Sequence, residues 1–151
     1  MWPLVIALLP LVIVLAVLWL VVGLVTSVVL LVVVWMTWCR RGRYSLLVYS
    51  SSPVWQDYFE HRVLPELAGR AAVLNWSERK RWQLSLPVLL FRVFGGTREF
   101  NPIAIVFAPW RWPRRFRFYR AFRSFKHGRP EEVEALRQEL LQALNELSKS
   151  K

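Results

Sequence analysis

The chain has 151 residues and a formal net charge of +11, and 55% of its residues are hydrophobic. Its single cysteine excludes an internal disulfide and a metal cluster bound by several thiolates. The two histidines, His61 and His127, show no ligand-like spacing, and we therefore expect neither a metal site nor another cofactor.

The first predicted element is an apolar segment that precedes every charged residue. No charged residue occurs between Trp2 and Trp38. A helix needs roughly 20 apolar residues to cross a bilayer core, and this segment is much longer. A cleavable signal peptide fits poorly, because no Lys or Arg precedes the segment and no small-residue cleavage site follows it. The sequence therefore predicts a transmembrane anchor over residues 1–39.

The number of times the anchor crosses the membrane is less well defined by the sequence. A single long helical span is favoured, tilted or kinked at Pro10. The alternative is a helical hairpin that turns between Trp19 and Gly23, where no charged or strongly polar residue is present. Gly23 and Ser27 form a small-xxx-small pair through which two copies could pack as a homodimer. The favoured explanation of this pair is a Val-rich span that simply contains two small residues.

Three arginines, Arg40, Arg41 and Arg43, directly follow the anchor. Under the positive-inside rule they place the rest of the chain in the cytoplasm for either number of spans. We therefore expect an integral membrane protein, of a bacterial inner membrane, with a cytoplasmic C-terminal domain.

Charge divides the remainder of the chain into two parts. Residues 40–129 contain 18 Lys and Arg against 5 Asp and Glu, a net charge of +13, whereas residues 130–151 carry a net charge of −2. A chain of this length supports one hydrophobic core and not two. We predict a basic α/β domain over 40–129 and, from residue 130, an amphipathic helix packed on that domain. A disordered tip is expected from Ser148 to Lys151.

Three short apolar stretches within this region suit strands that are buried on both faces. They are Ser45 to Tyr49, Ala71 to Leu74 and Ile103 to Ala108. Helical patterns follow each stretch, beginning near Ser52, Ser77 and Pro113, and the second pattern is interrupted by Pro87. The order strand, helix, strand, helix, strand, helix, helix predicts a small three-stranded parallel sheet with βαβαβαα connectivity.

Polar residues follow the carboxyl ends of the predicted strands, where open parallel sheets bind ligands. The candidate ligand residues are Ser50, Ser51, Ser52, Asn75, Ser77, Glu78, Arg79 and Arg111. Hydroxyl groups and free amides at a helix start suit an anion, and arginines add charge and bidentate donors. The alternative is that the Ser and Asn side chains are ordinary helix caps. No Gly-rich phosphate loop is present, and the catalytic residues are unknown, although Glu78 is a candidate general base.

The segment from Pro109 to Arg129 combines eight Lys and Arg with seven aromatic residues. Anionic lipid would attract it, at about 1 kcal/mol per basic residue near the surface. Nucleic acid is a second partner for such a segment, and a core-facing aromatic stripe with a solvated basic face is a third explanation. Attachment to a membrane favours lipid and disfavours nucleic acid. The expected contacts with the membrane or with a membrane-protein partner are Trp110, Trp112, Arg114, Arg115, Arg117, Arg120 and Arg123.

Together these patterns favour a membrane-anchored interaction or regulatory protein whose basic aromatic segment contacts anionic lipid or a membrane partner. The alternative is an enzyme or a phospholigand-binding domain with its site at the carboxyl edge of the sheet. The first predicted strand begins shortly after the anchor, and five residues span about 17 Å. If that strand points away from the membrane, its carboxyl edge faces the cytosol.

Overall fold

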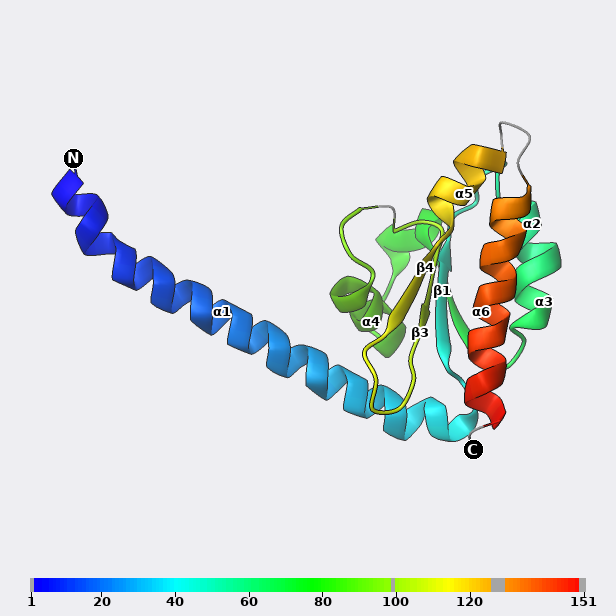
Figure 1. Cartoon of the computed structure of the whole chain (residues 1–151), viewed down its shortest axis with the longest axis horizontal. Helices are drawn as coiled ribbons and strands as arrows, with labels where there is room; N and C mark the ends of the chain where they lie inside the picture. The colour runs from blue at the N-terminus through cyan, green and yellow to red at the C-terminus, as the bar shows by residue number, and fades with distance from the viewer. Residues whose placement is uncertain (1, 99, 126–129, 150–151) are drawn as a thin grey trace. The chain divides into compact units, whose positions relative to one another are not determined.

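The computed structural model describes residues 2–98, 100–125 and 130–149, with side chains from residue 8 onward. Contacts within the chain divide it into two compact units, Met1–Val33 and Val34–Lys151. The order of helices and strands along the chain is shown in Figure 1.

Helix α1 begins at Trp2 and ends at Thr37. The first unit contains most of this helix, and the second unit contains its last turn. No turn interrupts α1, although Pro10 lies inside it, so the helical-hairpin alternative is wrong. The Thr26 hydroxyl donates a hydrogen bond to the Val22 carbonyl at 2.8 Å, which satisfies this polar group inside the helix. Among the described residues, α1 is the helix that is long and apolar enough to cross a membrane, by length and composition.

The second unit is built on a four-stranded mixed sheet with the strand order β2-β1-β3-β4. The strands are β1 (Ser45–Tyr49), β2 (Ala71–Asn75), β3 (Ile103–Val106) and β4 (Arg114–Arg117). Strands β1 and β2 are parallel, whereas β3 runs antiparallel to β1 and β4 runs antiparallel to β3. The α/β class is thus confirmed, but the prediction of a three-stranded parallel sheet is wrong.

The error arises at β3 and β4, which form a hairpin around residues 107–113. A short connection of this kind joins antiparallel strands, because parallel neighbours require a crossover of a dozen residues or more. Strand β4 replaces the start of the helix that was predicted near Pro113. Its sequence, RRFR, buries only Phe116, and arginines of this kind are typical of an edge strand.

Helices cover both faces of the sheet (Figure 1). The connection from β1 to β2 winds through α2 (Gln56–Tyr58), a π-helical turn (Phe59–Val63) and α3 (Leu64–Glu66). The connection from β2 to β3 contains a 3₁₀ helix (Trp76–Arg81) and α4 (Leu86–Phe94), which agrees with the predicted division at Pro87. Helix α4 packs on β1 and β2, on the face opposite α6.

The core beside β1 is aromatic. Phe59 is fully buried, and its ring stacks on that of Tyr49 with centroids 5.7 Å apart. The rings of Phe118 and Phe122, in α5 (Phe118–Phe125), also contact the Phe59 ring, with centroid distances of 5.2 Å and 5.8 Å. Phe118 and Phe122 therefore form a core-facing aromatic stripe, whereas Phe125 of the same helix is 42% exposed.

The last helix, α6 (Glu131–Lys149), packs on α5 and β3. Its buried residues are Val133, Leu140, Ala143 and Leu144. This face follows the predicted amphipathic pattern, and the helix docks on its own domain. Ser148 and Lys149, which were expected to be disordered, are helical, whereas Ser150 and Lys151 lie outside the described residues.

A polar network joins α6 to the segment between β1 and β2. The Tyr58 hydroxyl donates a hydrogen bond to Oε2 of Glu134 at 3.0 Å, and Arg137 forms ion pairs with Glu134 and Glu66. The hydrogen bonds from Arg137 lower the pKa of Glu134. Burial, and then the hydrogen bond to Glu134, raises the pKa of Tyr58 to about 12.

Tyr58 should make the stability of the domain fall in alkali. At a pH below its ordinary pKa of 10.0, the Tyr58 phenol is neutral in both the folded and the unfolded chain. Above this pH the unfolded chain loses the phenol proton, which the folded domain still holds. The stabilisation is therefore lost as the pH rises from 10.0 to about 12. Urea unfolding of the full chain in detergent micelles across this window should show a steeper loss for the wild type than for Tyr58→Phe. Identical pH profiles would exclude this role of Tyr58.

Candidate functional sites at the two ends of the sheet

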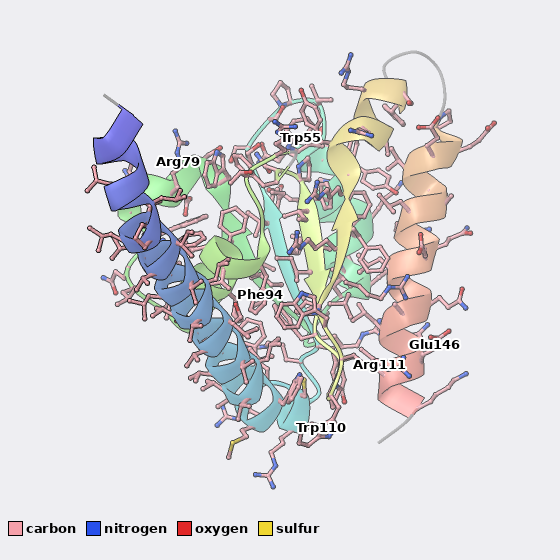
Figure 2. The ribbon with its side chains drawn as sticks, turned by 60° about the vertical axis from the view of Figure 1, so that its left-hand side comes forward. Trp55, Arg79, Phe94, Trp110, Arg111 and Glu146 are labelled. Carbon is pink, nitrogen blue, oxygen red and sulfur yellow. The ribbon has the colours of Figure 1, made fainter. Side chains whose placement is uncertain are left out.

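The antiparallel direction of β3 divides the candidate residues between two ends of the sheet. The end of the sheet at which β1 and β2 stop is called the carboxyl edge. The opposite end, at which they begin next to the last turn of α1, is called the α1 edge. Ser50–Ser52 and Asn75–Arg79 lie at the carboxyl edge, whereas Arg111 follows β3 and lies at the α1 edge. Figure 2 shows Trp55 and Arg79 at one end and Trp110 and Arg111 at the other. The predicted convergence of three loops on one edge is therefore wrong for Arg111.

At the carboxyl edge, three of the predicted residues bind one another. The Ser51 amide donates a hydrogen bond to Ser77 Oγ at 3.0 Å, and Asn75 Nδ2 donates one to Ser51 Oγ at 2.9 Å. The Ser77 amide in turn donates to Asn75 Oδ1 at 2.9 Å, which makes Asn75 the N-cap of the 3₁₀ helix. The structure thus brings the loops after β1 and β2 together, with these side chains acting as caps and ties.

Replacing Asn75 by alanine should loosen this edge. The variant removes a helix cap and a tie between two loops, and the expected loss in free energy of unfolding is about 1–2 kcal/mol. Thermal unfolding of the full chain checks this, with Lys80→Ala, an exposed residue of the same 3₁₀ helix, as the control. An equal effect of the two substitutions would contradict the capping role.

The other candidates at this edge also have local contacts. Ser50 Oγ accepts a hydrogen bond from Trp55 Nε1 at 3.1 Å. Ser52 Oγ accepts one from the Val54 amide at 3.4 Å. The Arg79 guanidinium lies over the Trp76 ring, 5.0 Å from its centroid, and Glu78 is exposed. His127 lies outside the described residues.

A pocket of about 510 Å³ opens at the carboxyl edge, with a lining that the sequence did not indicate. Its lining residues are Trp55, Trp76, Arg98, Phe100, Asn101 and Tyr119. Trp76 and Phe100 are 4.7 Å apart between ring centroids, and Trp55 and Tyr119 are 6.4 Å apart. Asn101 Oδ1 is buried and has no hydrogen-bond partner among the described residues. Phe100 and Asn101 precede β3, so the assumption of a parallel sheet assigned them to the opposite end.

At the α1 edge, the β3–β4 loop lies against the last turn of α1 and the residues that follow it. The rings of Trp35 and Trp110 are 5.2 Å apart between centroids, and those of Trp38 and Phe107 are 6.2 Å apart. The Cys39 thiol donates a hydrogen bond to the Phe107 carbonyl at 3.7 Å. The loop over residues 107–113 is therefore held beside the end of the apolar helix.

The tip of this loop is apolar and exposed to solvent. Trp110 is 87% exposed and Trp112 is 55% exposed. Trp110 has a φ of 60°, in the left-handed region that a bulky residue rarely occupies, which costs about 1–3 kcal/mol. Four exposed arginines lie on the segments that meet here: Arg40, Arg41, Arg43 and Arg111. The α1 edge therefore combines exposed tryptophans with positive charge.

The remaining residues of the basic aromatic segment lead away from this edge. Arg114 and Arg115 lie on β4, and Arg114 forms an ion pair with Glu139 of α6 at 2.9 Å. Arg117 ends β4 at the carboxyl edge, where α5 with Arg120 and Arg123 begins. The structure thus does not bring together all the residues that were expected to contact a membrane.

A second pocket, of about 490 Å³, lies between the base of the β3–β4 loop and the end of α6. Arg111, Trp112 and Glu146 contribute to its lining. Figure 2 shows Arg111 and Glu146 on neighbouring elements at this end of the domain.

Comparison with known proteins assigns this chain to no family. No protein-family model matches it, and neither a curated protein nor a solved structure matches it. We therefore infer the function from the geometry of the two edges.

Proposed function

We propose that the chain is a membrane-anchored interaction or regulatory protein whose cytoplasmic domain is seated on anionic lipid through its α1 edge. In this proposal α1 crosses the membrane, which we expect to be a bacterial inner membrane, and Arg40, Arg41 and Arg43 hold the domain on the cytoplasmic side. The observation that carries the proposal is the contact between Trp35 and Trp110, with ring centroids 5.2 Å apart. It places the exposed tip of the β3–β4 loop next to the end of the apolar helix.

The residues of this edge suit the boundary between lipid and water. Tryptophans are enriched in that layer because the ring is apolar and the indole N–H binds headgroup oxygens. Basic residues near an anionic surface each contribute about 1 kcal/mol. Trp110 is held in an unfavourable backbone conformation. This conformation is explained if the loop is shaped for contact with headgroups rather than for packing in its own domain.

The same geometry leaves the carboxyl edge free. Strand β1 begins two residues after Arg43 and has five residues, a length of about 17 Å. With the α1 edge on the lipid, the carboxyl edge and its pocket face the cytoplasm. One small domain can therefore contact the membrane at one end and a soluble ligand or partner at the other.

Hydrogen exchange of the full chain in lipid nanodiscs tests the proposal. The amides of residues 107–113 should exchange more slowly in nanodiscs that contain phosphatidylglycerol than in nanodiscs of phosphatidylcholine alone, because the arginines strengthen the contact with anionic lipid. The amides of Ser51 and Ser77, at the carboxyl edge, serve as the internal control and should not respond. Equal amide exchange of residues 107–113 in both kinds of nanodisc and in detergent would overturn the proposed contact of the α1 edge with lipid.

A further inference from the structure

The pocket at the carboxyl edge has the lining of a small-molecule site. Four of its six lining side chains are aromatic, and its volume of about 510 Å³ lies within the range of ligand pockets. Trp76 and Phe100 form one pair of rings, and Trp55 and Tyr119 form another. Aromatic side chains exposed in a pocket offer stacking surfaces for a flat ring, and base stacking on such side chains is favourable for every base.

One polar group in this lining is unsatisfied. Asn101 Oδ1 is buried without a hydrogen-bond partner among the described residues. A buried acceptor left unpaired is unfavourable, and a native structure seldom leaves one without water or a ligand. A ligand that carries an N–H group would satisfy it.

The charge of the pocket indicates a further feature of the ligand, an anionic group. Arg98 is the one charged residue among the six that line it. Arg117 lies close to Gly96, which is two residues before Arg98. A Cβ atom added to Gly96 would lie 3.4 Å from Nη2 of Arg117. Guanidinium groups prefer carboxylate and phosphate partners, to which they donate paired hydrogen bonds. An anionic group on the ligand is therefore expected at this side.

We propose that this pocket binds a small heteroaromatic anion: a flat ring with an N–H donor, joined to a phosphate or carboxylate. The ring stacks on the aromatic side chains, the N–H donates to Asn101 Oδ1, and the anionic group binds Arg98. Nucleoside monophosphates combine these three features and are suitable probes. This inference is independent of the membrane seat, because the pocket and the α1 edge lie at opposite ends of the sheet.

Isothermal titration of the full chain in phosphatidylcholine nanodiscs tests this inference with the monophosphates of adenosine, guanosine, cytidine and uridine. At least one should bind, and its nucleoside and ribose 5-phosphate should each bind more weakly. Arg98→Gln should weaken the monophosphate roughly tenfold or more and leave the nucleoside unchanged, because it removes a charge-assisted hydrogen bond. Tyr119→Ala, which changes an exposed side chain of α5, should weaken both.

Lys80→Gln is the matched control, because Lys80 is an exposed basic residue of the 3₁₀ helix at the same edge, lies outside the lining and should leave all affinities unchanged. Circular dichroism confirms that each variant is folded. Binding of none of the four monophosphates would overturn the inference, as would an equal effect of Arg98→Gln and Lys80→Gln. Affinity that increases with the length of a single-stranded oligonucleotide would also overturn it, in favour of a nucleic-acid surface.

Discussion

Replacing Phe59 by alanine should lower the free energy of unfolding of the domain by about 3–5 kcal/mol. Phe59 is fully buried, and its ring contacts Tyr49 of β1 as well as Phe118 and Phe122 of α5. Its removal leaves a cavity between the sheet and two helical segments that cannot all close around it. Urea unfolding of the full chain in detergent micelles, followed by near-ultraviolet circular dichroism, measures the effect.

Arg62→Ala is the control for this variant, because Arg62 is exposed on the same helical segment and should change stability by only about 0.5 kcal/mol. A loss for Phe59→Ala no larger than that of the control would show that the aromatic cluster does not support the fold. The position of the loops at the carboxyl edge would then lose its explanation, because β1 and α5 both lead to that edge.

The double variant Trp110→Gly/Trp112→Ser should release the domain from the membrane surface. Burial of each indole is worth about 1.5–3 kcal/mol, so the slow exchange of residues 107–113 in anionic nanodiscs should disappear. Glycine accepts the φ of 60° at position 110 without strain, which offsets part of the loss of the ring contacts of Trp110 with Trp35 and of Trp112 with Phe94. The stability of the domain should therefore fall by no more than about 1–2 kcal/mol. Hydrogen exchange and thermal unfolding of the same sample separate the two effects.

Leu84→Ser is the matched control, because Leu84 is a 76% exposed apolar residue outside the loop. It should leave the exchange of residues 107–113 unchanged. Slow exchange that persists in the double variant would show that the tryptophans do not hold the domain on lipid. A large fall in stability would instead indicate that they support the fold.

Much of the architecture could be predicted from the periodicity of apolar residues. The apolar helix, β1, β2 and α6 were all recognised from such patterns. Burial follows the pattern in β1 and on one face of α6, whereas the edge strand β2, predicted to be buried on both faces, is only partly buried. The direction of β3 has no such signal, because Ile103–Val106 is buried on both faces and reads identically in either direction. Strand β4 could not be recognised, because an edge strand with one buried side chain resembles a basic surface segment.

The same ambiguity limited the prediction of the sites. Ser51, Asn75 and Ser77 were correctly expected to come together, since they follow parallel neighbours. Asn101 and Tyr119 could not be assigned to the same edge without knowing that β3 begins there and β4 ends there. The reversal of β3 also carries Trp110 and Arg111 to the α1 edge. Strand direction therefore determines which aromatic and basic residues lie at each edge of the sheet.

The depth of two labelled positions in the bilayer is the most direct test of whether the α1 edge contacts the membrane. In a Cys39→Ala background, a single cysteine is placed either in the β3–β4 loop as Arg111→Cys or at the carboxyl edge as Lys80→Cys. Each is labelled with nitrobenzoxadiazole, and the full chain is reconstituted in nanodiscs that contain brominated phospholipid. Lipid bromine should quench the label at position 111 and leave the label at position 80 unquenched, because the two edges are separated by the length of the strands. Equal quenching at both positions would contradict a domain seated on the membrane through its α1 edge.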